Sequence, residues 1–194
     1  MAIYSDKTGP KILFITGGAR SGKSSFALQE ASKISGKKLF IATAEPLDAE
    51  MKERIDKHRK ERRGDWDTVE QPLEIHDTLM TSGPPYCAIL IDCLTLWLSN
   101  VMGGHEESPD MQARLEEAIN IFVKGLEEIK YSDSLFHDVS CIFIISNEVG
   151  MGIVPDNRLA RIFRDMAGRL NQKVAKIADE VYLVVSGIPL RLKG

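Results

Sequence analysis

Residues 17–24 read Gly-Gly-Ala-Arg-Ser-Gly-Lys-Ser, and this stretch decides how the rest of the chain is interpreted. It satisfies the pattern Gly-x-x-x-x-Gly-Lys-Ser/Thr, follows the apolar run 11–16 and opens a segment of helical character over 24–34. A Gly-rich turn can meet this pattern by chance, but a strand before it and a helix after it favour a phosphate-binding loop. In such a loop Lys23 reaches the β- and γ-phosphates and the Ser24 hydroxyl binds Mg²⁺. The sequence therefore predicts binding of a nucleoside triphosphate.

Short apolar runs alternate with segments of helical period along the rest of the chain. The further predicted strands are 38–43, 88–92, 141–146 and 181–185, and the further predicted helices are 48–63, 111–129 and 159–177. Strands that alternate with helices are typical of βαβ units and a mainly parallel sheet. We therefore expect an α/β fold with helices on both faces of the sheet. A single P-loop domain over 12–194 would follow an N-terminal extension over 1–11.

Composition limits what this protein can be. Its 194 residues can bury one sizeable core, and 43% hydrophobic with 27% charged residues is typical of a globular protein. A net charge of -3 does not favour a protein that coats nucleic acid. The longest apolar run, 86–91, falls far short of the roughly 20 residues of a membrane span. With three cysteines, no CxxC pair and no apolar leader at the start, we expect a cytoplasmic protein without a nucleic-acid partner or a membrane span.

Asp92 ends the predicted strand 88–92, and the phosphate loop follows another strand of the same sheet. A surface aspartate that starts a turn is the alternative interpretation. Because the carboxyl ends of parallel strands share one edge of a sheet, we expect the Asp92 carboxylate near the phosphate loop. There it would hold or orient Mg²⁺ together with Ser24.

His58 lies on the predicted helix 48–63, on the same face as Met51 and Ile55. Taken alone, it is best interpreted as a core histidine with one satisfied nitrogen. Its cationic neighbours, which are usually a solvated face, also suit phosphate binding. They are Arg54, Arg59, Lys60, Arg62 and Arg63. Among them a neutral imidazole is a candidate nucleophile at phosphorus, because its reference pKa of about 6.5 leaves a lone pair available near pH 7.

A Gly-rich loop over 146–157 follows the predicted strand 141–146 and leads into a helix that carries four arginines. Loops at the carboxyl ends of parallel strands bind the substrate in such sheets. The alternative is a long connection whose arginines face solvent. The sequence of the loop does not identify a ligand.

These segments together resemble the bifunctional adenosylcobinamide kinase / adenosylcobinamide-phosphate guanylyltransferase family. The resemblance runs from about Ile12 to Lys193. Its motifs are GGARSGKS (17–24), IATAE (41–45), EMKERIDKHRKER (50–62), DCLTLWLSN (92–100), NEVGMGIVPDNRLARIFRDMAGRLNQ (147–172) and VYLVVSGIP (181–189). It implies a RecA-like P-loop fold, a homotrimer and two reactions. A nucleoside triphosphate phosphorylates adenosylcobinamide, and GTP then transfers GMP to the phosphate through a GMP–histidine intermediate, giving adenosylcobinamide-GDP and pyrophosphate.

The resemblance also assigns roles to single residues. His58 matches the family's nucleophilic histidine. Lys23 as the second catalytic residue and Ser24 and Asp92 as Mg²⁺ ligands follow from the phosphate-loop pattern and the strand end described above, and the resemblance agrees with these positions. GTP and ATP are the implied nucleotide substrates. The implied nucleotide contacts are Gly17, Gly18, Ala19, Arg20, Ser21, Gly22, Lys23, Ser24, Ala42, Thr43, Ala44, Arg59, Lys60, Glu61, Arg62, Glu70 and Asp92.

Two other functions stay open at this point. A monofunctional P-loop kinase of a small molecule would use Lys23, Ser24 and Asp92 but would give His58 no chemical task. A nucleotide-binding regulatory module would couple slow hydrolysis to a conformational change and would need a partner protein. The regulatory module leaves the motifs outside the phosphate loop without an explanation.

Overall fold

The computed structural model describes residues 9–45, 64–83, 85–103, 108–131 and 136–194. Within these ranges the strands are β1 (Lys11–Thr16), β2 (Lys38–Ala42), β3 (Trp66–Glu70), β4 (Ala88–Asp92), β5 (Cys141–Ile145), β6 (Glu180–Val185) and β7 (Ile188–Lys193). The helices are α1 (Lys23–Ala31), α3 (Ile75–Thr81), α4 (Leu94–Gly103), α5 (Met111–Tyr131) and α6 (Arg158–Ile177).

The described strands form one sheet in the order β3-β2-β4-β5-β1-β6-β7. All neighbouring pairs are parallel except β6 and β7, which are antiparallel. Strand β5 separates β1, which leads into the phosphate loop, from β4, which ends at Asp92. Strand β5 is buried along its whole length, and this burial explains its unbroken apolar sequence, which is typical of a parallel strand covered on both faces.

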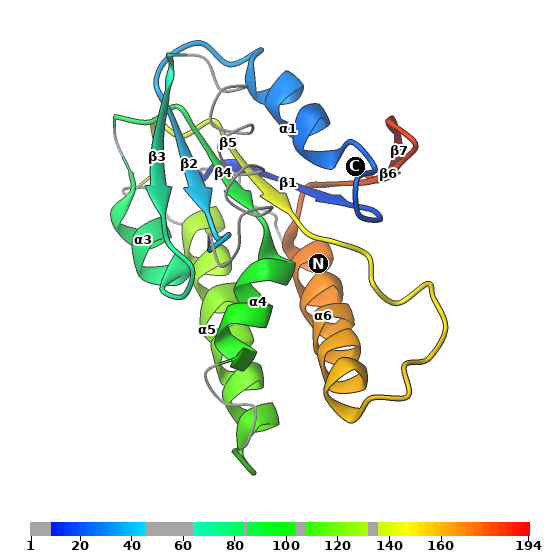
Figure 1. The fold of residues 1–194 in the computed structure, drawn as a ribbon. Helices are drawn as coiled ribbons and strands as arrows, with labels where there is room; N and C mark the ends of the chain where they lie inside the picture. Colours follow the sequence, from blue (N-terminus) through cyan, green and yellow to red (C-terminus); the bar gives the residue numbers. More distant parts are fainter. Residues whose placement is uncertain (1–8, 46–63, 84, 104–107, 132–135) are drawn as a thin grey trace, which may run out of the picture.

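Helices cover both faces of the sheet, as Figure 1 shows for α1 on one side and α4, α5 and α6 on the other. Leu13 and Ile15 of β1 pack in the cluster that contains Ala27 and Ala31 of α1. The alternate residues of β1 pack in the larger cluster with α5 and α6. The helices α4, α5 and α6 also continue past the carboxyl ends of the strands (Figure 1), so they stand beside the edge where the phosphate loop lies.

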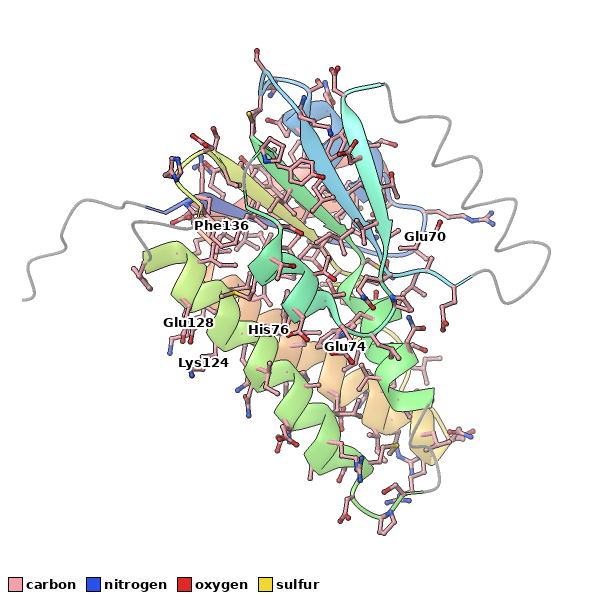
Figure 2. The ribbon with its side chains drawn as sticks, turned by 90° about the vertical axis from the view of Figure 1, so that its left-hand side faces the viewer. Glu70, Glu74, His76, Lys124, Glu128 and Phe136 are labelled. Carbon is pink, nitrogen blue, oxygen red and sulfur yellow. The ribbon has the colours of Figure 1, made fainter. Side chains whose placement is uncertain are left out.

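The small helix α3 is held against α5 by a close contact. A Cβ atom at Gly125 of α5 would lie 2.5 Å from Nδ1 of His76, so this position has no room for a side chain (Figure 2). Glycine at this point therefore lets the two helices approach. Lys124 and Glu128, on the exposed part of the same helix, form an i,i+4 ion pair with 3.4 Å between their charged atoms.

The structure confirms the α/β fold with a mainly parallel sheet and helices on both faces. Each of the five predicted strands is present to within one residue, and the predicted helices 24–34, 111–129 and 159–177 correspond to α1, α5 and α6. Helix α1 ends at Ala31 rather than at residue 34. The predicted helix 48–63 lies outside the described residues. The domain boundary at residue 11 stays a prediction, because the description begins at residue 9.

Four elements were not predicted. Strands β3 and β7 lie at the two edges of the sheet, where exposure removes the need for an apolar run. Helix α4 has apolar residues on most of its surface, which hides the helical period, and α3 is only seven residues long. In the part of the chain that the structure describes, no helix combines the length and apolarity needed to cross a bilayer.

Candidate active site

The phosphate loop joins β1 to the N-terminus of α1 in a backbone conformation that only glycine adopts easily at two points. Gly17 has φ 147°, and a Cβ atom there would lie 2.3 Å from the carbonyl oxygen of Val184. Gly22 has φ 98° and precedes α1 without a side-chain hydrogen bond to the helix, whose first turn contains no acidic residue. The backbone N–H groups and the positive end of the helix dipole therefore make this terminus a site for an anion.

Lys23 is folded into the loop rather than extended into solvent. Its side-chain Nζ donates to the carbonyl oxygen of Gly18 at 2.6 Å and lies 3.5 Å from the hydroxyl of Ser21, and the residue is only 6% exposed. A buried ammonium group is costly unless negative groups surround it. This position therefore suits contact with the oxygen atoms of a phosphate.

The hydroxyl of Ser24 donates to Oδ2 of Asp92 at 2.7 Å. This bond connects the start of α1 to the end of β4, although β5 lies between β1 and β4 in the sheet. A hydroxyl oxygen and a carboxylate oxygen are hard donors of the type that Mg²⁺ prefers. The pair therefore fits a magnesium ion.

The turn between β6 and β7 supports the phosphate loop from outside. Ser186 and Gly187 both have positive φ values, 52° and 82°, as expected for a two-residue hairpin turn. The backbone N–H of Gly187 donates to the carbonyl oxygen of Ser21 at 2.8 Å. The Ser-Gly pair after the apolar run 181–185 is the sequence signal for this turn, which sequence reasoning did not predict.

The strand ends beyond β4 continue the same edge of the sheet. Ala42 pairs in register with Asp92 on one side and with Glu70 on the other. Thr43 is fully buried, where its hydroxyl donates to the carbonyl oxygen of Cys93 at 2.8 Å and accepts from the backbone N–H of Cys93 at 2.7 Å. Thr43 therefore fixes the loop after β2 to the loop after β4.

Glu70 lies apart from the phosphate loop. It ends β3 at the outer edge of the sheet, where Figure 2 labels it. Strand β3 is four strand positions from β1, which corresponds to roughly 19 Å at about 4.8 Å per strand. A carboxylate at that distance does not contact the phosphates held by residues 17–24. It lies within the reach of a ligand that extends along the carboxyl edge of the sheet.

The loop over 146–157 is attached to the phosphate loop and to two helices. The backbone N–H of Glu148 donates to the carbonyl oxygen of Gly17 at 2.9 Å. The side-chain amide of Asn147 donates to the hydroxyl of Thr95 at 2.8 Å, and that of Asn171 donates to the carbonyl oxygen of Asn147 at 3.1 Å. Sequence reasoning did not identify Thr95, Asn147 or Asn171.

Three of the arginines that follow this loop have partners on the protein itself. Arg161 donates to the carbonyl oxygens of Pro155 and Asp156 at 2.9 and 2.6 Å. Arg164 pairs with Asp165, and Arg169 pairs with Glu116 of α5. These contacts give no direct sign of a ligand for the arginines.

Burial, together with the nearby charge of Asp92, raises the pKa of the Cys93 thiol to about 11. The thiol is therefore neutral at physiological pH. It packs at the end of β4 with its sulfur 3.2 Å from the hydroxyl of Thr95. Cys93 thus acts as a packing residue rather than as a nucleophile.

The structure brings the predicted residues 17–24 and Asp92 together at one point. The predicted contacts Ala42, Thr43, Ala44 and Glu70 lie further along the same edge, where Ala42 and Ala44 are half-buried and Glu70 is exposed. His58 and the neighbouring residues predicted to contact the nucleotide lie outside the described residues. The neighbours are Arg59, Lys60, Glu61 and Arg62.

A family model and three relatives match almost the whole length of this chain. A family model described as cobinamide kinase / cobinamide phosphate guanyltransferase matches residues 13–192. The "bifunctional adenosylcobalamin biosynthesis protein CobU" of Salmonella typhimurium is 40% identical over 194 residues, covering 94% of this chain and 99% of the relative. The protein of that name from Escherichia coli K12 is 40% identical over 190 residues, with the same two coverages. CobP of Pseudomonas aeruginosa, described in the same words, is 37% identical over 180 residues and covers 93% and 96%.

Among solved structures, the RadB recombinase has a similar fold. Its TM-score is 0.52 at 12% sequence identity, over 91% of this chain and 75% of the recombinase chain. At this identity the likeness concerns the fold alone. It supports the RecA-like P-loop architecture that the sequence led us to expect.

Proposed function

Because this chain belongs to the family of cobinamide kinases / cobinamide phosphate guanyltransferases, we propose that it performs two successive reactions. A nucleoside triphosphate, ATP or GTP, phosphorylates the hydroxyl of adenosylcobinamide. GTP then guanylylates the new phosphate, giving adenosylcobinamide-GDP and pyrophosphate. The observation that carries this proposal is the phosphate loop with Lys23 inside it and the Ser24–Asp92 hydrogen bond beside it.

In the kinase reaction the protein positions the phosphates and stabilises their charge. The backbone N–H groups at the start of α1 and the ammonium group of Lys23 would bind the β- and γ-phosphate oxygens. As the hydroxyl of the acceptor attacks the γ-phosphorus, it loses its proton to solvent. The bond from that phosphorus to the β–γ bridging oxygen breaks, and the electron pair stays on that oxygen. The developing charge on that oxygen lies within reach of the same groups.

Ser24 and Asp92 would hold Mg²⁺ when it is bound. The metal would then offset negative charge on the phosphate oxygens and on the leaving group. The hydrogen bond between the two side chains supports this assignment, because it holds both oxygen atoms on one side of the phosphate loop.

In the guanylyl-transfer reaction we assign the nucleophile to His58 on the basis of the sequence. The lone pair of its imidazole forms a bond to the α-phosphorus of GTP, and the α–β bridging bond breaks to release pyrophosphate with the electron pair. An oxygen of adenosylcobinamide phosphate then attacks the same phosphorus, and the N–P bond breaks to restore neutral His58. The basic residues Arg59, Lys60 and Arg62 would offset the charge of the pyrophosphate.

We extend the proposal to the assembly and the compartment. The family resemblance implies a homotrimer, and the cysteine usage favours the cytoplasm. Adenosylcobinamide and its phosphate are the proposed partners besides the nucleotides. Sedimentation equilibrium of the purified protein tests the trimer, and a monomer at micromolar concentration would contradict it.

Incubation with α-labelled GTP tests the guanylyl-transfer reaction directly. We expect acid-labile, alkali-stable label on the protein, mapped by mass spectrometry as one GMP on one residue. The variant His58→Ala should carry no label, whereas His137→Ala, which removes an exposed histidine elsewhere, should be labelled like the unaltered protein.

The same experiment separates the bifunctional enzyme from a monofunctional kinase. If His58→Ala and the unaltered protein both phosphorylate adenosylcobinamide but neither carries GMP, the histidine has no covalent role. The kinase reaction then stands alone. Label on a residue other than His58 would contradict the assignment of the nucleophile.

A further inference from the structure

Three buried polar atoms near the root of the phosphate loop have no hydrogen-bond partner among the described residues. They are Oγ1 of Thr16, Oγ of Ser146 and Oδ1 of Asn171. The three residues are 7%, 0% and 7% exposed. The fourth such atom in the described part of the chain, Nδ1 of His76, belongs to the contact between α3 and α5. Buried polar atoms in folded proteins are almost always paired with protein or with ordered water.

The three atoms come from elements that meet on one face of the sheet. Ile15 of β1 pairs in register with Ile145 of β5, so Thr16 and Ser146 are the next neighbours across the two strands. Both continue the alternation that places Ile12, Phe14, Ile142 and Ile144 in the cluster with α6. Asn171 lies on the buried side of α6, and its amide donates to the carbonyl oxygen of Asn147, the residue after Ser146.

Hydrogen-bond chemistry restricts what can satisfy these atoms. The bond from Asn171 Nδ2 to a carbonyl oxygen fixes the orientation of the amide, so its Oδ1 atom needs a donor. One water molecule can donate to Asn171 Oδ1 and to one hydroxyl oxygen while it accepts from the other hydroxyl. This arrangement satisfies all three atoms. A cation is disfavoured because the three oxygens are neutral and burial of an uncompensated charge is costly.

We propose that one buried water molecule binds to Thr16, Ser146 and Asn171 and links α6 to the roots of two loops. Thr16 immediately precedes the phosphate loop, and Ser146 begins the loop over 146–157. These loops are also joined by the bond from the backbone N–H of Glu148 to the carbonyl oxygen of Gly17. The water therefore holds in place the backbone from which the phosphate loop starts, whatever acceptor the enzyme uses.

A crystal structure of the unaltered, ligand-free protein tests the site itself. We expect one solvent peak within hydrogen-bond distance of all three oxygen atoms. Direct bonds between the side chains, with no peak between them, would overturn the proposal. A peak that gives an anomalous signal after sodium and potassium are exchanged for rubidium would replace the water with a cation, and would overturn it too.

Variants test the link to the phosphate loop. Ser146→Val fills the water position with methyl groups, and Thr16→Val keeps the shape of Thr16 without its hydroxyl. In both we expect the peak to disappear and the Kd of a fluorescent GTP analogue to rise roughly two- to tenfold. The control Ser140→Val, an exposed position at the other end of β5, should leave the Kd unchanged. Loss of the peak without a change in Kd would overturn the positioning role, and the crystal structure of the unaltered protein decides the site even if a variant fails to fold.

Discussion

Polar groups are paired differently at the two ends of the strands, which form the amino edge and the carboxyl edge of the sheet. At the amino edge, charged side chains are buried and paired with one another. Lys130 of α5 and Asp179 are 9% and 7% exposed, with 3.1 Å between their charged atoms, and the other carboxylate oxygen of Asp179 accepts from the backbone N–H of Ile12 at 2.9 Å. At the carboxyl edge, Lys23 is equally buried but bonds to a backbone carbonyl, and two nearby hydroxyls have no protein partner in the described residues.

We infer from this difference that the amino edge mainly contributes to stability and the carboxyl edge mainly to function. A buried charge that is paired with an opposite charge contributes to the stability of the fold and gains little additional interaction energy from a ligand. Lys23 lies inside the phosphate loop, where its ammonium group gains a charge-assisted hydrogen bond when an anionic phosphate binds. Substitutions at the amino edge should therefore change stability, and substitutions at the carboxyl edge should change activity.

The largest effect should follow from Lys23→Met at the carboxyl edge. We expect the rate of phosphoryl transfer to adenosylcobinamide to fall roughly 100- to 1000-fold, because the developing phosphate charge loses its buried cation. The free energy of unfolding, measured by urea denaturation, should not fall. Lys33→Met, which removes an exposed lysine paired with Glu30, is the matched control and should keep near-normal activity. A Lys23→Met protein that loses stability as well as activity would contradict the contrast.

A somewhat smaller effect should follow from Lys130→Met at the amino edge. We expect the free energy of unfolding to fall by about 3 kcal/mol, because Asp179 is left as a buried charge without its partner. The double variant Lys130→Met/Asp179→Asn should recover part of this loss, since asparagine can still accept from the Ile12 N–H. Kinase activity per folded molecule should stay close to normal. If kinase activity fell while the free energy of unfolding stayed unchanged, the amino edge would also contribute to the active site.

The smallest effect concerns the pH dependence of stability at the amino edge. Hydrogen bonding to Lys11, followed by that to Tyr182, lowers the pKa of Glu180 below its usual 4.5. The unfolded chain therefore binds this proton more readily, so Glu180 adds stability above its unfolded pKa and loses it as pH falls through the folded pKa. Urea midpoints measured from about pH 6 downward should fall less steeply for Glu180→Gln than for the unaltered protein. Equal slopes would mean that Glu180 has the same pKa in both states.

The parts of the fold that sequence predicted are those where local burial fixes the residue types. The strands β1, β4 and β5 are covered on both faces, so their apolar runs are unbroken and their limits are clear. The edge strand β7 is exposed along its whole length and contains Pro189, and no run of that kind marks it. Its strand character depends on pairing with β6, and the local sign of that pairing is the Ser186-Gly187 turn between the two strands.

In the candidate site, too, some residues could be predicted from the local sequence and others could not. Lys23, Ser24 and Asp92 were predictable because a motif and a strand end identify them separately. The bonds from Thr43 to Cys93 and from Asn147 to Thr95 depend on which strands become neighbours. That order, with β5 between β1 and β4, is a property of the assembled sheet.

The contact between the β6–β7 turn and the phosphate loop has a consequence for folding. Ser21 lies near the start of the sequence and Gly187 near its end, and β1 pairs on its two sides with the late strands β5 and β6. Contacts between such distant residues form slowly, because a long stretch of chain must be ordered first. During synthesis, the glycine-rich motif would therefore be present well before the chain could bind a nucleotide. GTP affinity would then indicate that β5 and β6 have paired with β1.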